Sequence, residues 1–238
     1  MSGPRRIVLT RTAEQCRPWR RTLESLGMDV LTLPLLRYVP LDPPSDLDTT
    51  AFDWILFTSP QGVRAFCDAG FPAGQARFGV LGDGSAAALA ACGHEDDLKV
   101  RALDGTGLAR DFVGRITPPA KVLLPGPDRR MDDPRLTLVA AGFDVVELPL
   151  YRTDAVAPTE LPDDPWRPGD LIFFASPSAV RACAARWGAV APCVAIGETT
   201  AIASREAGFE TVVADTPDLI AMIRAAGPDP VPDSKETS

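Results

Sequence analysis

The sequence predicts an α/β fold made of two similar doubly wound parallel-sheet domains, joined by a two-stranded crossover, with the first domain discontinuous. Three observations predict it. Hydrophobic runs typical of strands alternate with helical patterns along the chain, as in parallel sheets covered by helices on both faces. Landmarks of the first half recur in the second half at a constant spacing. Each half also contains a Leu-Pro-Leu segment, at residues 33–35 and 148–150.

The internal repeat is the most informative of these observations. Three pairs of landmarks are each separated by 115 residues: Gly27 and Gly142, Pro34 and Pro149, and Gly93 and Gly208. Landmarks that keep their register over half a chain indicate two copies of one structural unit.

The two Leu-Pro-Leu segments predict where the chain changes domain. Proline cannot donate a hydrogen bond to a sheet, so each segment suits an edge or a crossing between domains. Crossing at both places gives a first domain of residues 1–36 and 152–226 and a second domain of residues 37–151. Residues 227–238, rich in Pro, Asp and Ser, are expected to form a disordered tail. A length of 238 residues is comfortable for two such domains.

The elements of the first half follow from hydrophobic runs and capping residues. Thr12, with Gln15 three residues later, predicts a capping box that opens a helix ending near Gly27, and Pro18 inside it predicts a kink or a later start. Ser59, followed by Pro60, predicts the start of another helix. Strands are expected at residues 7–10, 28–33, 53–58, 78–81, 100–103, 121–124 and 144–148, and further helices at residues 85–93, 107–116 and 134–141.

The last third repeats this pattern. Ser176 and Pro177 again predict an N-cap and a first helical residue, and Gly208 predicts the end of the next helix. Strands are expected at residues 171–174, 194–196 and 211–214, and the final helix at residues 218–225.

Composition excludes several classes of function. The net charge of −8 and the pI near 4.7 argue against nucleic acid or an anionic membrane as the main partner, although local arginines can still bind an anionic small molecule.

Five cysteines without a C-x-x-C pair favour buried free thiols in a reducing cytoplasm over a disulfide or metal framework. With no export signal and no membrane-spanning run, we expect a soluble cytoplasmic protein. His94 is the only histidine, so we expect neither a Ser-His-Asp triad nor a metal site.

Small hydroxyl residues follow four of the predicted strands and run into helices. They lie in Thr58-Ser59-Pro60, Gly82-Asp83-Gly84-Ser85, Ser176-Pro177-Ser178 and Gly197-Glu198-Thr199-Thr200. Each is expected first as a helix cap. Because ligands of such sheets bind at the carboxyl ends of strands, the four together also predict a carboxylate- or phosphate-binding cleft between the domains.

One of these turns also fits a nucleotide-binding pattern. Gly82 begins a G-x-G-x-x-A sequence between a strand and a helix, and Asp104 follows at the distance of a ribose-binding acid. The corresponding turn at Gly197 lacks the second glycine, and the motif does not follow the first strand of its region. Nucleotide binding is therefore a minor alternative.

These motifs, in this order and spacing, resemble the uroporphyrinogen-III synthase family from Leu9 to the helix near Ile223. The resemblance is carried by the Leu-Gly and Leu-Pro-Leu segments, Phe57-Thr58-Ser59, Gly82-x-x-Ser85, Leu148-Pro149-Leu150-Tyr151-Arg152-Thr153, residues 174–180 and residues 196–201. The chain departs from the family at Ser85, where threonine is usual, and at Gln61, where asparagine is frequent.

The resemblance implies two α/β domains joined by two strands and a cyclising lyase of tetrapyrrole biosynthesis that needs no cofactor or metal. The implied substrate is hydroxymethylbilane, an anionic linear tetrapyrrole that loses water and closes with inversion of its last ring through a spiro intermediate. We expect a cytoplasmic monomer with neither nucleic-acid nor membrane partners.

The resemblance also implies which residues form the site. Tyr151 matches the tyrosine thought to assist departure of the hydroxyl, although packing at the crossover is the simpler interpretation of its ring. The expected substrate-binding residues are Arg11, Thr58, Ser59, Ser85, Arg152, Ser176, Thr199 and Thr200. For Arg11 and Arg152, surface or interdomain ion pairs are an equal alternative. A non-catalytic two-domain ligand-binding or regulatory protein on the same scaffold is the alternative function.

Overall fold

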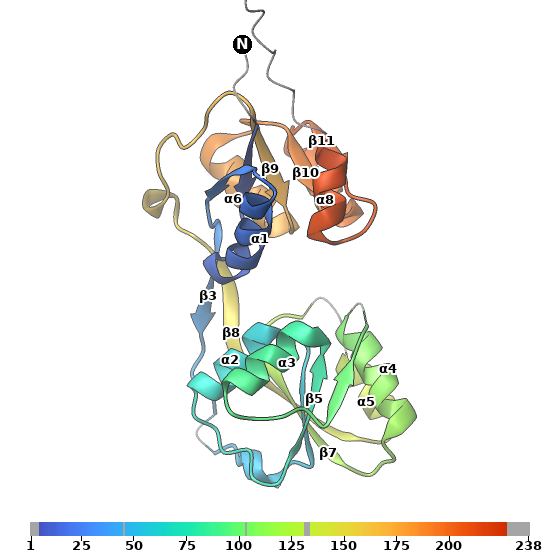
Figure 1. Cartoon of the computed structure of the whole chain (residues 1–238). Coiled ribbons are helices and arrows are strands. Elements are labelled where there is room, and N and C mark those ends of the chain that lie inside the picture. The colour runs from blue at the N-terminus through green and yellow to red at the C-terminus, as the bar shows by residue number, and fades with distance from the viewer. Residues whose placement is uncertain (1–4, 45, 103, 131–133, 228–238) are drawn as a thin grey trace, which may run out of the picture. The chain divides into compact units, whose positions relative to one another are not determined.

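Two parallel-stranded sheets organise the chain, in a computed structural model that describes residues 5–44, 46–102, 104–130 and 134–227. The chain divides into two compact units (Figure 1). Unit 1 comprises Met1–Tyr38 and Asp154–Ser238, and unit 2 comprises Val39–Thr153. The tail predicted at residues 227–238 lies, from residue 228 onward, outside the described residues.

Unit 1 contains a five-stranded sheet in the order β11-β10-β9-β1-β2, and every neighbouring pair is parallel. Its strands and helices are β1 (Arg6–Leu9), α1 (Ala13–Ser25), β2 (Asp29–Thr32), β9 (Asp170–Phe174), α6 (Pro177–Trp187), β10 (Cys193–Ala195), α7 (Glu198–Glu206), β11 (Thr211–Val213) and α8 (Leu219–Ala226).

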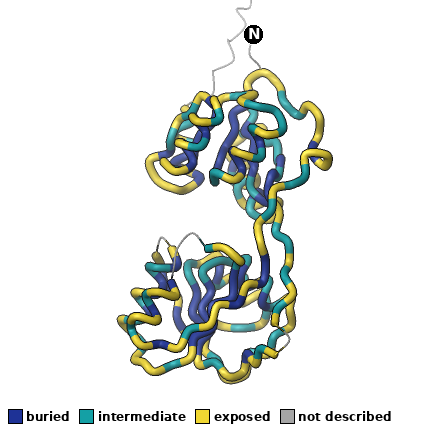
Figure 2. Tube along the Cα trace, turned by 180° about the vertical axis from the view of Figure 1, so that it is seen from behind, coloured by how far each residue is buried: buried dark blue, intermediate teal, exposed yellow. Residues whose placement is uncertain are grey.

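Alternating residues of its strands bury against helices on opposite faces. Ile7 and Leu9 lie in one core cluster with residues of α1 and α8, whereas Val8 lies in a second cluster with residues of α6. Because successive side chains of a strand point to opposite faces, a strand buried on both sides is a continuous apolar run. Figure 2 shows buried segments inside each unit.

Unit 2 contains a sheet in the order β3-β8-β7-β4-β5-β6, parallel from β8 to β6. Its elements are β3 (Leu36–Pro40), β4 (Trp54–Phe57), α2 (Pro60–Asp68), β5 (Arg77–Leu81), α3 (Gly82–Ala91), β6 (Leu98–Val100), α4 (Gly105–Arg115), β7 (Lys121–Pro127), α5 (Pro134–Ala140) and β8 (Asp144–Ala155), with β3 beginning in the last residues of unit 1. Together the two sheets confirm the predicted fold class.

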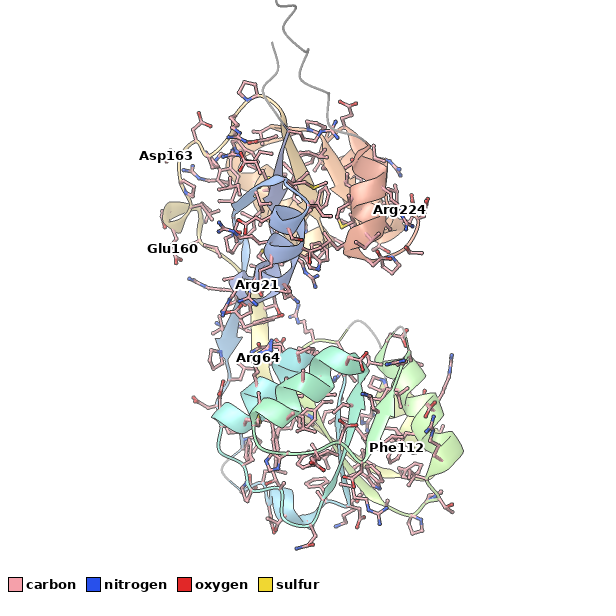
Figure 3. The ribbon with its side chains drawn as sticks, viewed as in Figure 1. Arg21, Arg64, Phe112, Glu160, Asp163 and Arg224 are labelled. Atoms are coloured by element: carbon pink, nitrogen blue, oxygen red, sulfur yellow. A yellow bond between two sulfur atoms is a disulfide. The ribbon has the colours of Figure 1, made fainter. Side chains whose placement is uncertain are left out.

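The core of unit 2 also has two faces. Phe112 of α4, labelled in Figure 3, is fully buried and packs edge-on against Trp54 at a centroid distance of 5.1 Å. On the other face Phe57 meets Phe66 of α2 at 5.6 Å. The unit therefore buries its sheet between α4 and α5 on one side and α2 on the other.

The predicted N-caps of α1, α2 and α6 are confirmed. Thr12, Ser59 and Ser176 each accept a hydrogen bond from the backbone N–H three residues later. Pro18 lies inside α1, and the helix starts at Ala13, so a later start was the wrong expectation.

β8 is longer than predicted, because the strand continues through Pro149 to Ala155. Leu150 accepts a hydrogen bond from Leu41 on one side, and Tyr151 accepts one from Asp128 on the other. Since backbone groups of a strand alternate between its two neighbours, the missing N–H of Pro149 removes one bond and leaves the rest of the ladder.

The expectation that all five cysteines are free thiols is wrong. A disulfide joins Cys67 of α2 to Cys92 at the end of α3, whereas Cys16, Cys183 and Cys193 are free and buried. The sequence gives no cue for this pair, because its partners become neighbours only when the two helices pack side by side.

Within the described residues, no helix has the length and apolar character needed to span a bilayer.

Candidate functional site

Tyr151 lies on β8 directly after Leu150, the extra residue of a β-bulge in that strand. Gly126 is in register with Pro149, but the next residue, Pro127, is in register with Tyr151, so the ladder is irregular between Gly126 and Pro127. A bulge of this kind changes the direction in which nearby side chains point. The sequence predicted a crossover here, and the structure adds the local distortion that sets the orientation of the phenol.

The hydroxyl of Tyr151 lies beside the first turn of α2. Its Oη is 3.3 Å from Oγ of Ser59, and either hydroxyl can be the donor. Ser59 is held in turn as the N-cap of α2, because its Oγ accepts the N–H of Gly62 at 3.1 Å. Two predicted site residues, 92 positions apart in the chain, are thus brought together within unit 2.

Burial keeps this phenol neutral. Tyr151 is only 5% exposed, and this burial raises the pKa of its hydroxyl above the ordinary value. The hydrogen bond with Ser59 and the positive charge of Arg130 oppose the shift without reversing its direction. At neutral pH the hydroxyl therefore carries its proton and can donate it in a hydrogen bond.

Arg130 is the residue of this site that sequence reasoning missed. Its guanidinium donates to Oγ1 of Thr58 at 3.1 Å, to the carbonyl of Leu124 at 2.9 Å and to a carboxylate oxygen of Glu147 at 3.1 Å. These acceptors belong to or directly follow three neighbouring strands, β4, β7 and β8. The cue in the sequence is positional: Arg130 follows the end of a buried strand by three residues, much as the predicted hydroxyl residues follow theirs.

Two glycines allow these groups to approach one another. A Cβ on Gly126 would lie 2.5 Å from the nearest guanidinium nitrogen of Arg130. A Cβ on Gly62 would lie 3.2 Å from the carbonyl oxygen of Pro125, so the first turn of α2 sits directly on the backbone of β7. Both positions favour glycine because of close approach.

Ser85 does not lie in the predicted turn. α3 begins at Gly82, immediately after β5, without a side-chain cap, and Ser85 lies inside its first turn, fully buried. Its Oγ has no hydrogen-bond partner among the residues that the structure describes. The turn was wrongly expected because glycine and serine also occur in the first turn of a helix. In α3 this first turn offers backbone N–H groups without a partner in the helix, and the hydroxyl of Ser85 is buried.

Unit 1 presents a similar pair of helix starts. Ser176 is half-buried and caps α6 by accepting the N–H of Ala179 at 3.2 Å. α7 begins after Gly197 without a side-chain cap, so Thr199 and Thr200 are helical residues and not caps. Thr199 is exposed, whereas Thr200 is buried.

The two predicted arginines have different surroundings. Arg11 lies over the ring of Trp19 at 4.6 Å and donates to Gln15 at 3.3 Å, and its burial lowers the pKa of the guanidinium from the ordinary value. Arg152 lies on β8 with an exposed side chain. Their contact with substrate stays a prediction.

The groups expected for nucleotide binding are arranged for another purpose. Asp104 is the N-cap of α4, and its carboxylate accepts the N–H of Gly107 at 2.8 Å. A carboxylate used as a cap is already partnered, which argues against the ribose-binding role.

Known proteins resemble this chain in sequence. "Uroporphyrinogen-III synthase, chloroplastic" of Oryza sativa subsp. japonica is 29% identical over 230 residues, which cover 88% of this chain and 75% of the rice protein. "Porphyrin biosynthesis protein HemD" of Ruminiclostridium josui is 26% identical over 163 residues, which cover 63% of this chain and 32% of that protein.

Solved structures share the fold. The uroporphyrinogen-III synthetase of Helicobacter pylori has a TM-score of 0.66 at 18% identity, covering 93% of this chain and 98% of that one. A mutant uroporphyrinogen III synthase of Thermus thermophilus has a TM-score of 0.52, also at 18% identity, covering 93% of this chain and 97% of that one.

The family model described as "Uroporphyrinogen-III synthase HemD" matches residues 17–224, which is most of the chain and covers all of unit 2 and the larger part of unit 1. The chain therefore belongs to the uroporphyrinogen-III synthase family.

Proposed function

We propose that this protein is the uroporphyrinogen-III synthase of its tetrapyrrole pathway and that it converts hydroxymethylbilane into the type III macrocycle. In this reaction the terminal hydroxyl leaves as water, the last pyrrole ring inverts through a spiro intermediate, and the ring closes. Family membership and the names of the relatives support the enzyme class. The observation that carries the proposal is the neutral phenol of Tyr151, held against Ser59 at the carboxyl end of β4.

Tyr151 is proposed as the group that assists departure of the hydroxyl. A hydroxide leaving a carbon next to an electron-rich pyrrole needs only modest acid assistance, and a neutral phenol supplies it as a hydrogen-bond donor. Burial, which keeps the phenol protonated, suits this task. The pyrrole supplies the electron pair that expels the leaving group, so the reaction is largely one of positioning a flexible substrate.

The acetate and propionate groups of the substrate are proposed to bind at the helix starts. α2, α3, α6 and α7 each follow a parallel strand directly and begin with N–H groups that have no partner within the helix. Thr58, Ser59, Ser176 and Thr199 are the hydroxyl residues proposed to add contacts there. For Ser85 and Thr200, which are buried, the contribution is proposed to come from the backbone of the first turn. Arg11 and Arg152 are proposed as further carboxylate contacts.

A cytoplasmic location and a monomeric state complete the proposal and stay predictions.

The test is to supply freshly generated hydroxymethylbilane and to resolve the porphyrin isomers after oxidation. Type III product is expected. Type I product alone, which is the outcome of spontaneous closure, would contradict the proposal and favour the non-catalytic alternative.

A further inference from the structure

Arg130 is buried far more than its sequence neighbour Arg129. Its side chain is 8% exposed, whereas Arg129 is an exposed residue of the same turn. A buried guanidinium is costly unless its N–H groups are partnered. Three of the five N–H groups of Arg130 have acceptors among the described residues, and one of these acceptors is a carboxylate, that of Glu147.

The contacts of Arg130 fix one end of the candidate site. The guanidinium is a rigid planar fork, so binding to Leu124 and Glu147 determines where its third donor points. That donor meets Oγ1 of Thr58. Because Oγ1 then acts as an acceptor, the hydrogen of the Thr58 hydroxyl must point elsewhere, and Thr58 is left as a donor for a ligand.

Thr58 precedes Ser59, the residue whose hydroxyl meets the phenol of Tyr151. A shift of Thr58 would therefore move the N-cap of α2 and the partner of the phenol together. The positive charge of Arg130 also acts on the phenol directly.

This inference rests on the proposed function. We propose that Arg130 is a positioning residue that holds the Thr58–Ser59 segment next to the phenol of Tyr151, and that the absence of a side chain at Gly126 makes room for the guanidinium of Arg130. A Cβ at residue 126 would lie 2.5 Å from one guanidinium nitrogen and 3.0 Å from the central carbon, so an alanine there would force the guanidinium to shift.

The first test is a double-mutant cycle in the full-length protein. Arg130→Met in the wild-type background should lower kcat by about ten- to a hundredfold, the range for a misplaced catalytic group. In a Tyr151→Phe background the same substitution should lower kcat by a much smaller factor, because the phenol through which Arg130 acts is already gone. Equal losses in both backgrounds would overturn the proposal, since a purely structural role does not depend on the phenol.

The matched control is Arg129→Met, which removes the same charge from the same turn and should leave kcat near the wild-type value. A comparable loss in Arg129→Met would assign the effect to net charge and overturn the proposal. Arg130→Lys should fail to restore activity, because an ammonium group cannot reproduce a planar fork that reaches three acceptors. Full rescue by lysine would contradict the positioning role.

Gly126→Ala keeps the guanidinium but displaces it, so it serves if Arg130→Met does not fold. It should reproduce the loss of kcat and the dependence on Tyr151. Unchanged kcat in a folded Gly126→Ala protein would show that the space at Gly126 does not position the guanidinium, and this would overturn the proposal.

A second readout needs no substrate and so separates this inference from the proposed function. The chain has two tyrosines, so Tyr38→Phe leaves Tyr151 as the one phenol whose ionisation the near-ultraviolet absorbance reports. In that background Arg130→Met should reduce the tyrosinate fraction at a fixed alkaline pH, because the positive charge that lowers the phenol pKa is lost. An unchanged fraction would contradict the proposal even if the wild-type protein forms type III product. Conversely, a wild-type protein that forms only type I product would overturn the proposed function while leaving this readout intact.

Discussion

At the scale of single residues, the site depends on a polar group that is buried and yet partnered. Tyr151 is nearly inaccessible, but its hydroxyl meets Ser59, which is fixed by the first turn of α2. Removing only the phenolic oxygen should separate chemistry from packing.

Tyr151→Phe should fold normally and lose kcat by about ten- to a thousandfold, the range of one acid or hydrogen-bond contribution. The ring and its packing remain, so the melting temperature should change little. Tyr38→Phe, which removes the other phenol of the chain, is the control and should remain active. Wild-type turnover in a folded Tyr151→Phe protein would leave Tyr151 with a packing role alone.

The residues of the site were only partly predictable. Thr58, Ser59 and Tyr151 were named from the sequence, because hydroxyls after apolar strands and a tyrosine at the crossover stand out locally. Arg130 was not, because its importance arises from acceptors on three strands that are distant in sequence. Ser85 was placed in a turn because glycine is typical of turns, whereas here α3 begins at the glycine itself.

At the scale of elements, one buried ion pair ties two strands of unit 1. Arg6 of β1 donates to both carboxylate oxygens of Asp170 in β9, at 2.8 and 2.7 Å, and the side chain of Asp170 is fully buried. The two residues are also in register in the parallel ladder. Their pairing therefore belongs to the centre of the sheet.

Arg6→Met should lower the free energy of unfolding by about 3 kcal/mol, because it leaves the carboxylate of Asp170 buried with less compensation. The control is Arg37→Met. Arg37 pairs with Glu160, labelled in Figure 3, but both side chains are 48% exposed, so its loss should cost less than about 1 kcal/mol. Denaturant unfolding of both variants measures the two changes in the free energy of unfolding. Similar changes would show that burial does not determine how much these ion pairs stabilise the fold.

The disulfide between Cys67 and Cys92 links α2 and α3, whose starts belong to the proposed carboxylate-binding surface. Closing 25 residues of chain should stabilise unit 2 by about 3 kcal/mol through the lower entropy of the unfolded state. Cys67→Ser with Cys92→Ser should lower the melting temperature, as should a reducing agent on the wild-type protein. A melting temperature that is insensitive to reductant would argue against this crosslink in solution.

The helices and strands themselves were predicted better than the residues at which they begin and end. The N-caps at Thr12, Ser59 and Ser176 were named correctly, because capping depends on neighbours three residues away. The extension of β8 through Pro149 was not predicted, because it depends on partners in β3 and β7 that a local pattern does not contain.

At the scale of the whole molecule, the repeat and the two crossings were the strongest predictors. The 115-residue spacing indicated two similar units, and the alternation of strand and helix patterns indicated a parallel sheet in each. The disulfide could not be predicted at this scale, because it depends on which helices become neighbours and not on the order of elements. The family was predicted from the joint order of many short motifs, none of which is specific alone.

The most direct test of the central claim is the isomer composition of the product as a function of protein concentration. Spontaneous closure of hydroxymethylbilane to the type I isomer competes with the enzyme. The type III fraction should therefore rise with protein concentration until it accounts for nearly all of the product, and Tyr151→Phe should need much more protein to reach the same fraction. A type I product whose fraction does not change at any protein concentration would contradict the assignment of this chain as a uroporphyrinogen-III synthase.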